Sequence, residues 1–445
     1  MGLKCVRAWL LLISMLISLQ GLRMEGCLKQ ERSALLQLKH FFNDPNRLQN
    51  WVEGHGNLDC CDWESVGCNF RTGRVIFLDL GSTRNQELGE WYLNVSLLSS
   101  FQELEILYLN GNLIAGCIEN EVSGLSNLEY LWLTGNMFNN SILSYVSTLS
   151  SLKQLNLTNI GLKGTVDLQE LDSLSNLEEL TMGGNEIKKI VISKGETSLR
   201  NLTRLYLHNM SISDGSSLLQ TLGSFPSLKN VEFYYNFFSG AVNTYELNNF
   251  TNVREFQLYD STLHISFLRS IGAFMLLDSL SMDDCEVSGV LTDQELPSFK
   301  NLKNLYISDT VFHNNFFQVI GAMTSLEDIY ITSSDISETL LDQGTFPWWC
   351  VANLIFLEEL DISINSFSGH IPMEIGAYLP VLNSFNISGN TFEGCIPSSF
   401  GDMKSLKYLD MSNNFLTGGI LEELAGCISL EHLALSNNSL QGQIF

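Results

Sequence analysis

Hydrophobic residues recur along most of the chain in one spacing, L-x-x-L-x-L-x-x-N-x-L, whose central L-x-L alternates apolar and polar positions. This alternation predicts a short strand with its leucines on one face. Clear copies begin at Leu104, Leu128, Leu177, Leu357, Leu382, Leu406 and Leu430, and degraded copies begin at Leu152, Leu202, Leu228, Val253, Leu277, Leu302 and Leu326. Successive copies start 24 to 26 residues apart, with one step of 31 residues after Leu326. The pattern therefore predicts 14 repeats that follow an opening strand at Val75.

A repeat of this length cannot bury its leucines alone, so neighbouring repeats must stack. We expect an α/β solenoid in which the strands form a parallel sheet on the concave face, about 4.8 Å apart. The ninth template position should turn inward, where an amide can bond to the backbone of neighbouring turns. Cys285 occupies the same position and is expected to be a small buried thiol. The asparagines at this position are Asn112, Asn136, Asn185, Asn236, Asn365, Asn390, Asn414 and Asn438.

The N-terminus has the pattern of a secretory signal. Lys4 and Arg7 precede an apolar run over residues 8–19, which as a helix would rise about 18 Å and would not cross a hydrocarbon core of about 30 Å. We expect residues 1–26 to be a signal peptide, the alternative being an uncleaved signal anchor. No later run of 18 apolar residues follows, so the sequence predicts no further membrane span.

Charge and secretion narrow the function. The 49 acidic and 24 basic residues give a net charge of −25, which argues against binding to nucleic acid or to an anionic membrane surface. In a secreted chain, N-x-S/T sequons predict a glycosylated surface. They occur at Asn94, Asn139, Asn156, Asn201, Asn209, Asn249, Asn386 and Asn437.

The sequence carries no catalytic or metal-binding motif. Its seven histidines are scattered, and neither H-E-x-x-H nor G-x-S-x-G occurs. The kinase motifs G-x-G-x-x-G and H-R-D are also missing. We therefore expect a protein that is not an enzyme and that uses no metal or cofactor.

Two further patterns resemble a known family. The segment from Cys27 through Trp51, Asp59-Cys60-Cys61-Asp62-Trp63 and Val66-Gly67-Cys68 resembles an N-terminal cysteine cap. The motif Gly-x-Ile-Pro follows two repeats, ending at Ile371-Pro372 and Ile396-Pro397. Over residues 27–445 the chain resembles the ectodomain of a plant leucine-rich-repeat receptor-like protein. The resemblance implies a cap over residues 27–74 and leucine-rich repeats over 75–445, the last of them incomplete.

The four cap cysteines could pair in three ways, and because adjacent Cys60 and Cys61 do not easily bond to each other, two pairings remain. The family resemblance implies Cys27–Cys60 and Cys61–Cys68. We expect Trp51 and Trp63 to pack beneath this cap. Five cysteines remain, and we expect mostly buried thiols, the alternative being a Cys395–Cys427 bridge; the five are Cys117, Cys285, Cys350, Cys395 and Cys427.

The long step between repeats spans residues 337–356 and contains Trp348 and Trp349. We expect a longer convex loop or an extra helical turn there, with the two rings packed over the back of the sheet. A contact with a partner protein is the alternative.

The outward template positions change character in the middle of the solenoid. From the repeat at Leu202 to the repeat at Leu326 they carry tyrosines among carboxylates, and most of these repeats lack the inward asparagine. Rings and carboxylates suit a peptide or protein that carries Lys or Arg. The competing explanation is that tyrosine favours strands and that the acids follow the net charge. We name these residues the Tyr–Asp stripe: Tyr206, His208, Tyr234, Tyr235, Tyr259, Asp260, Asp283, Asp284, Tyr306, Asp309, Asp328 and Tyr330.

The resemblance implies an extracellular ligand-binding ectodomain that signals through a partner leucine-rich-repeat receptor kinase, in plant defence or development. It also implies a place on the extracellular side of the plasma membrane, or secretion if the chain ends at Phe445. The alternatives are a secreted inhibitor of a cell-wall-degrading enzyme, similar to the polygalacturonase-inhibiting proteins, and a truncated decoy or non-functional remnant. The 14 repeats with a divergent middle favour the receptor.

Overall fold

The computed structural model describes most of the chain outside the N-terminal segment, in two compact units, Met1–Ile160 and Gly161–Phe445. The expected signal peptide, the sequon at Asn249 and part of the long step, residues 337–343, lie outside the described residues. The described ranges are 27–42, 47–53, 59–118, 124–194, 197–210, 212, 215–238, 252–272, 274–289, 299–312, 316–336, 344–419 and 422–442.

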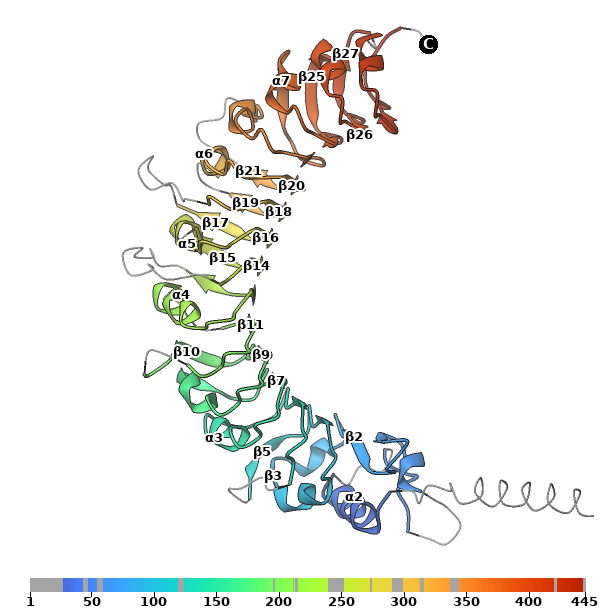
Figure 1. Ribbon diagram of the computed structural model, residues 1–445, viewed down its shortest axis with the longest axis vertical. Helices are drawn as coiled ribbons and strands as arrows, with labels where there is room; N and C mark the ends of the chain where they lie inside the picture. The colour runs from blue at the N-terminus through green and yellow to red at the C-terminus, as the bar shows by residue number, and fades with distance from the viewer. Residues whose placement is uncertain are drawn as a thin grey trace, which may run out of the picture. The chain divides into compact units, whose positions relative to one another are not determined.

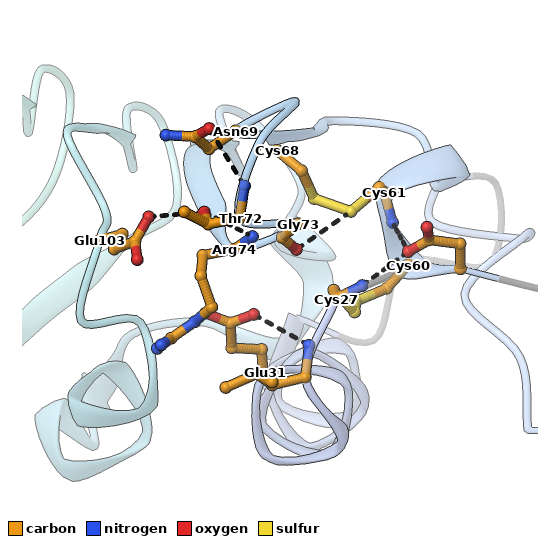
Figure 2. The surroundings of a disulfide bond; sticks show 12 residues. Cys27, Glu31, Cys60, Cys61, Cys68, Asn69, Thr72, Gly73, Arg74 and Glu103 are labelled. Carbon is orange, nitrogen blue, oxygen red and sulfur yellow. Dashed lines mark hydrogen bonds and ion pairs between the residues drawn. A yellow bond between two sulfur atoms is a disulfide. The ribbon is translucent and has the colours of Figure 1, made fainter. Parts of the chain in front are cut away.

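The first unit begins with a cap built on helix α2, Lys29–Phe42. Disulfides Cys27–Cys60 and Cys61–Cys68 join Cα atoms 5.6 and 5.5 Å apart, which confirms the pairing implied by the family resemblance. Arg74 Nε lies 2.8 Å from the fully buried carboxylate of Glu31, so an ion pair ties the helix to the entry of the first repeat. Figure 2 labels both residues beside the two disulfides. The indoles of Trp51 and Trp63 are buried and stacked 5.6 Å apart, as expected.

The leucine alternation produces the main sheet of this unit, in the order β1-β2-β4-β6-β7. Strand β1 belongs to the cap and pairs antiparallel with β2, a contact that the repeat pattern did not predict. The bounds are β1 Val66–Cys68, β2 Val75–Asp79, β4 Ile106–Tyr108, β6 Tyr130–Trp132 and β7 Gln154–Asn156. The remaining elements are β3 Trp91–Leu93 and β5 Ile114–Cys117, the short 3-10 helices η1 Cys60–Asp62, η2 Gln86–Leu88 and η3 Val95–Ser100, and helix α3 Ile142–Val146.

The second unit continues the design with a parallel sheet in the order β9-β11-β12-β14-β16-β18-β20-β22-β24-β26-β28. In Figure 1 these strands form one side of the unit, and α4 to α6 lie on the other. Strands β11 to β20 are five residues long: β11 Arg204–His208, β12 Asn230–Tyr234, β14 Glu255–Tyr259, β16 Ser279–Asp283, β18 Asn304–Ser308 and β20 Asp328–Thr332. The other strands are three residues long: β9 Glu179–Thr181, β22 Glu359–Asp361, β24 Ser384–Asn386, β26 Tyr408–Asp410 and β28 His432–Ala434.

Smaller parallel sheets and short helices complete each turn of this unit. The additional strands are β8 Lys163–Asp167 and β10 Glu186–Val191; β13 Phe237–Phe238, β15 Thr262–His264, β17 Glu286–Ser288, β19 Val311–Phe312 and β21 Asp335–Ile336; and β23 Ser368–His370, β25 Thr391–Cys395 and β27 Phe415–Thr417. The helices are η4 Leu168–Leu171, α4 Gly215–Gly223, α5 Ile265–Ile271, α6 Phe316–Gly321, η7 Trp348–Cys350, α7 Ile375–Tyr378, η8 Ser398–Asp402 and η9 Glu422–Gly426.

The inward asparagines form the expected hydrogen-bonded ladder. Asn390 Nδ2 donates to the carbonyl oxygens of Ile362 and Ile387, and its Oδ1 accepts from the Phe367 N–H at 3.0 Å. In the divergent repeats a hydroxyl performs part of this role, since Thr310 Oγ1 accepts from the Cys285 N–H and donates to the Ser308 carbonyl. Cys285 is buried as expected, and this burial raises the pKa of its thiol to about 11.

The long step contains the extra helical turn η7 that the sequence suggested. Trp348 is buried and packs edge-on against Phe346, whereas Trp349 points to solvent, so only one ring follows the packing expectation. None of the five described cysteines outside the cap forms a disulfide, so the alternative Cys395–Cys427 bridge is not formed. Cys285, Cys350 and Cys427 are buried, and Cys395 is exposed. Within the described ranges, no helix has the length and hydrophobicity needed to span a membrane.

Candidate ligand-binding face

The five-residue strands carry the exposed face of the sheet in the second unit. On each of them the second and fourth side chains are buried, and the first, third and fifth reach solvent. Parallel pairing without a register shift aligns the exposed side chains in three rows across the strands. The first row runs from Arg204 to Asp328, the middle row from Tyr206 to Tyr330, and the last row from His208 to Thr332.

The twelve residues of the Tyr–Asp stripe divide between two surfaces. Eight lie in the three rows, and four follow the strands in a turn, where each adopts a positive φ between 45° and 53°. We call the first group the sheet-face set: Tyr206, His208, Tyr234, Tyr259, Asp283, Tyr306, Asp328 and Tyr330. We call the second group the turn-edge set: Tyr235, Asp260, Asp284 and Asp309.

Rings on the sheet face form two stacked pairs. Tyr234 and Tyr259 lie 4.4 Å apart between ring centroids with an interplanar angle of 14°. Tyr306 and Tyr330 lie 5.2 Å apart at 23°. Between the pairs, β16 presents only small side chains in its first two exposed rows, Ser279 and Ser281. The face therefore has two aromatic ridges with a lower strip between them.

Carboxylates surround both ridges. Glu232 and Glu255 lie near the first pair, and Asp328 and Glu359 lie near the second. Burial raises the pKa of Glu232, and its acidic neighbours Glu255 and Glu179 raise it further. Burial likewise raises the pKa of Asp328, with the carboxylates Glu359, Glu327 and Glu358 adding to the shift. The face therefore holds more negative charge than its own bases neutralise.

The bases in the rows are Arg204 and His208. Arg204 Nε donates to Glu179 at 2.9 Å, so its charge is already paired. His208 Nε2 lies 3.8 Å from Glu232, too far for a hydrogen bond, and burial lowers the pKa of the ring, which leaves it uncharged at neutral pH. Gly183 makes room for this histidine, because a Cβ at that position would lie 2.5 Å from the His208 Cβ.

The turn-edge set has a separate structural explanation. In the regular repeats the corresponding left-handed position is glycine in Gly184 and Gly389 or asparagine in Asn413. Aspartate tolerates this backbone conformation better than most residues, so Asp260, Asp284 and Asp309 suit the turn. Tyr235 is a bulky residue in the same conformation and is 62% exposed. The set lines a shallow hollow together with five neighbouring residues: Ser261, Thr262, Cys285, Glu286 and Val311.

Two family descriptions match the chain. Leucine rich repeat matches residues 355–416 and 380–440, and Leucine rich repeat N-terminal domain matches residues 28–69. Cuscuta receptor 1 of Solanum lycopersicum is 30% identical over 245 residues, which cover 51% of this chain and 22% of that protein. Receptor-like protein 14 of Arabidopsis thaliana is 36% identical over 124 residues, 26% of this chain and 12% of that protein.

Two segments of the chain thus match leucine-rich-repeat families, and the chain is similar to plant receptor-like proteins. Each alignment spans less than a quarter of the relative's own length. Solved structures agree with the fold. A Leptospira interrogans leucine-rich-repeat protein has a TM-score of 0.54 at 22% identity, covering 82% of this chain and 84% of that one. A TDR receptor has a TM-score of 0.51 at 21% identity, covering 81% and 60%.

The first unit carries an aromatic patch that the sequence analysis missed. Tyr108 and Trp132 occupy the same template position on neighbouring strands and stack 4.5 Å apart. Trp132 is 39% exposed. The signal was present in the sequence, because both residues occupy the fifth template position, which also defined the stripe in the later repeats.

The sequons are distributed over several surfaces. Asn386 lies on the exposed sheet face of β24, where its Nδ2 donates to Asp361 at 2.8 Å. Asn156 lies at the equivalent position of β7 in the first unit. Asn209 and Asn437 occupy left-handed turn positions, and Asn94 caps η3. Of the described sequons in the second unit, only Asn386 therefore stands in a strand of the main sheet.

A metal ion has a single geometric candidate among the described residues, formed by Cys27, Asp59 and Cys60. Two of these three form a disulfide, which removes both thiolates as ligands. The Tyr–Asp stripe does not bring three such side chains together within the described ranges. The stripe presents rings, hydroxyls and carboxylates.

Proposed function

We propose that this chain is the extracellular ligand-binding part of a receptor-like protein and that the sheet-face set binds a peptide or protein carrying Lys or Arg. The observation that carries the proposal is the exposed face of β11 to β20, where two stacked tyrosine pairs lie among carboxylates that lack matching bases. Rings supply rigid contact area and attract cations, and carboxylates pair with the same cations. The negative face also speeds the encounter with a basic ligand.

The proposed localisation and signalling partner rest on similarity to other proteins and are part of the same proposal. The relatives are called receptor or receptor-like proteins, and the family is one of extracellular ectodomains that are generally not catalytic. We place the chain on the extracellular side of the plasma membrane or in secretion, with a leucine-rich-repeat receptor kinase as its signalling partner. Defence and development are both compatible with this role.

Glycosylation of the eight sequons belongs to the same proposal. Glycans at Asn386 and Asn209 would stand beside the sheet-face set rather than within it, because neither residue lies among its rows. Peptide mass spectrometry of the secreted chain before and after glycosidase treatment tests each described site. Unmodified asparagine at every site would contradict passage through the secretory pathway.

A display selection tests the ligand class. A random peptide library is selected against the secreted chain and, in parallel, against the double variant Y234A/Y306A, which removes one ring from each stacked pair. We expect Lys and Arg to be enriched on the unmodified chain and the enrichment to fall at least tenfold on the variant. The matched control is Tyr408→Ala, which removes a half-buried ring that stacks on His432 outside β11 to β20.

Two outcomes would overturn the proposal. One is a selection that yields no peptides, and the other is a selection of basic peptides that bind the double variant equally well. The alternative of a secreted inhibitor is tested separately, by adding the chain to a fungal polygalacturonase. Inhibition there, together with a failed selection, would replace the receptor by an inhibitor.

A further inference from the structure

Most carboxylates on the exposed sheet face already have a partner. Glu255 accepts from the side-chain amides of Asn230 and Gln257. Asp283 accepts from the Ser308 hydroxyl, and Glu359 accepts from the Tyr330 hydroxyl. Two acids of this face differ. Within the described ranges, neither Glu232 nor Asp328 receives a side-chain hydrogen bond or lies within 3.5 Å of a basic group.

Glu232 lies in the middle row of β12, beside the first tyrosine ridge. Its side chain is 23% exposed, so much of its hydration is already lost. The nearest base is His208 at 3.8 Å, and that ring is uncharged at neutral pH because burial lowers its pKa. Glu179 and Glu255 add repulsion. A half-buried carboxylate without a counter-charge is destabilising for the protein alone and is compensated when a cation arrives.

Asp328 repeats this arrangement beside the second ridge. It lies in the first row of β20, next to Glu359 on β22. The bases nearby are committed elsewhere, since Lys303 bonds to Glu327 at 2.6 Å. The Tyr306 ring is 39% exposed, and its hydroxyl is kept protonated because burial and Asp328 raise its pKa. Asp328 therefore combines an uncompensated charge with an adjacent ring and an O–H donor.

The distance between these two positions follows from the sheet. Four strand steps separate β12 from β20, which is about 19 Å at about 4.8 Å per step. The offset between the middle and first rows is about 7 Å along the strand and lengthens the separation to about 20 Å. The path crosses the low strip of Ser279 and Ser281 between the ridges. An extended peptide covers about 20 Å in six residues.

We propose that the ligand of this face is an extended peptide with two basic side chains about six residues apart, which crosses β12 to β20 with one cation at Glu232 and the other at Asp328. The inference rests on the proposed function, because it assumes that the sheet face binds a ligand. The inference adds the spacing of the ligand's two charges and the direction in which the ligand crosses the strands.

A rigid ruler tests the spacing. Polyproline forms an extended helix with about 3.1 Å per residue and about three residues per turn. Acetylated and amidated peptides with two arginines separated by two, five or eight prolines therefore hold both side chains on one face, about 9, 19 or 28 Å apart. We expect the five-proline peptide to bind the secreted chain about tenfold more tightly than either other ruler, measured by calorimetry at low salt and neutral pH.

Three variants and one control show which groups recognise the spacing of the two arginines. Glu232→Gln and Asp328→Asn should each bring the five-proline peptide to the affinity of the other two. Asp410→Asn is the matched control, because Asp410 lies on the same sheet outside β11 to β20 and accepts from Ser412. Ser281→Tyr should weaken only the five-proline peptide, since it fills the strip that this peptide crosses without changing charge. Circular dichroism and melting temperature establish that each variant is folded.

The outcomes separate this inference from the proposed function. Equal binding of all three rulers, with loss on Y234A/Y306A, would overturn the spacing and leave a basic-peptide receptor. Binding that is tightest at five prolines but unchanged by both Glu232→Gln and Asp328→Asn would overturn the assignment of the two acids. If neither the rulers nor the display library yields a peptide that binds, both ideas fail together.

Discussion

The repeats that carry β11 to β20 and those that carry β22 to β28 share one leucine pattern but differ in how each strand ends. In the later repeats a side-chain oxygen at the third strand position accepts the N–H two residues on: Asp361 from Ser363, Asn386 from Ser388 and Asp410 from Ser412. In β22, β24 and β26 the strand ends at this turn, after three residues. The middle row of the earlier repeats holds tyrosine, glutamate, glutamine or serine.

The consequence is a wider sheet face. The described strands of the divergent repeats carry no such acceptor bond and pair over five residues. The two added positions create the last row, which holds His208, Tyr234, Tyr259 and Asp283. The regular repeats have no such row. A change that loosens the regular pattern therefore also creates the surface to which we assign recognition.

The largest expected difference between the two groups of repeats concerns the inward hydrogen-bonded side chains. Asn390→Ala leaves the carbonyls of Ile362 and Ile387 and the N–H of Phe367 without their partner inside the core. Thr310→Ala removes one accepted and one donated hydrogen bond. At about 1 kcal/mol or more for each unsatisfied group, we expect a loss of about 3 kcal/mol for Asn390→Ala and about 1–2 kcal/mol for Thr310→Ala.

Urea unfolding of the two variants beside the unmodified chain measures these losses in the free energy of unfolding. The m-value serves as the control, since an unchanged slope shows that both variants unfold the same structure. Equal losses would mean that the hydroxyl replaces the asparagine fully. The inward hydroxyls of the divergent repeats would then stabilise the fold as much as the asparagines of the regular repeats do.

Much of this fold is readable from the sequence, because the L-x-L pattern and the ninth-position asparagine have direct physical meanings. Each copy of the template, including the degraded one at Val253, supplies a strand of the main sheet. Strand length was not predicted, and short strands occur both with an acceptor at the third position, as in β26, and without one, as in β28. The antiparallel β1 was missed because it belongs to no repeat.

The sequence predicted which repeats carry the site, but not which of their side chains share one surface. Alternation places Tyr234 and Tyr259 on one face, yet it does not show that the backbone turns left-handed directly afterwards and separates Tyr235 and Asp260 from them. The sequence also could not predict that the carboxylate of Glu359 has a hydrogen-bond partner and that of Asp328 has none among the described residues. Both are acids in the first exposed row, and only side-chain geometry shows that Tyr330 bonds to one of them.

A smaller effect is expected at the left-handed turn that follows each strand, which both groups of repeats share. Tyr235 has φ 53° in the divergent repeats, and Ile364 has φ 54° in the regular ones. Such a conformation costs a residue with a Cβ about 1–2 kcal/mol, and glycine avoids this cost while losing some entropy. We expect Tyr235→Gly and Ile364→Gly each to raise the free energy of unfolding by about 0.5–1 kcal/mol in the same urea experiment.

Asp284→Gly is the control, because aspartate tolerates the turn and should change stability by less than about 0.5 kcal/mol. If Tyr235→Gly is destabilising while Ile364→Gly is stabilising, contacts of the Tyr235 ring outweigh its backbone strain. That result would give the turn edge of the divergent repeats a structural role of its own.

The smallest expected effect concerns the uncompensated acid. The pKa of Asp328 is raised in the folded chain by burial and by Glu359, Glu327 and Glu358. An acid with a raised folded pKa favours folding in its protonated form, so stability falls as pH rises from the unfolded value of about 3.9 through the raised value. Asp328→Asn should therefore raise the melting temperature by about 1 °C at pH 7, where the carboxylate is ionised, and leave it unchanged at pH 3.

Asp361→Asn separates this effect from a general gain on removing negative charge. Asp361 accepts hydrogen bonds from Ser363 and Asn386, so its replacement should lower the melting temperature at pH 7. A gain for both variants would point to net charge alone as the cause. A loss for Asp328→Asn would mean that this carboxylate has a stabilising partner in the free protein, and the reason for expecting a ligand cation at that position would disappear.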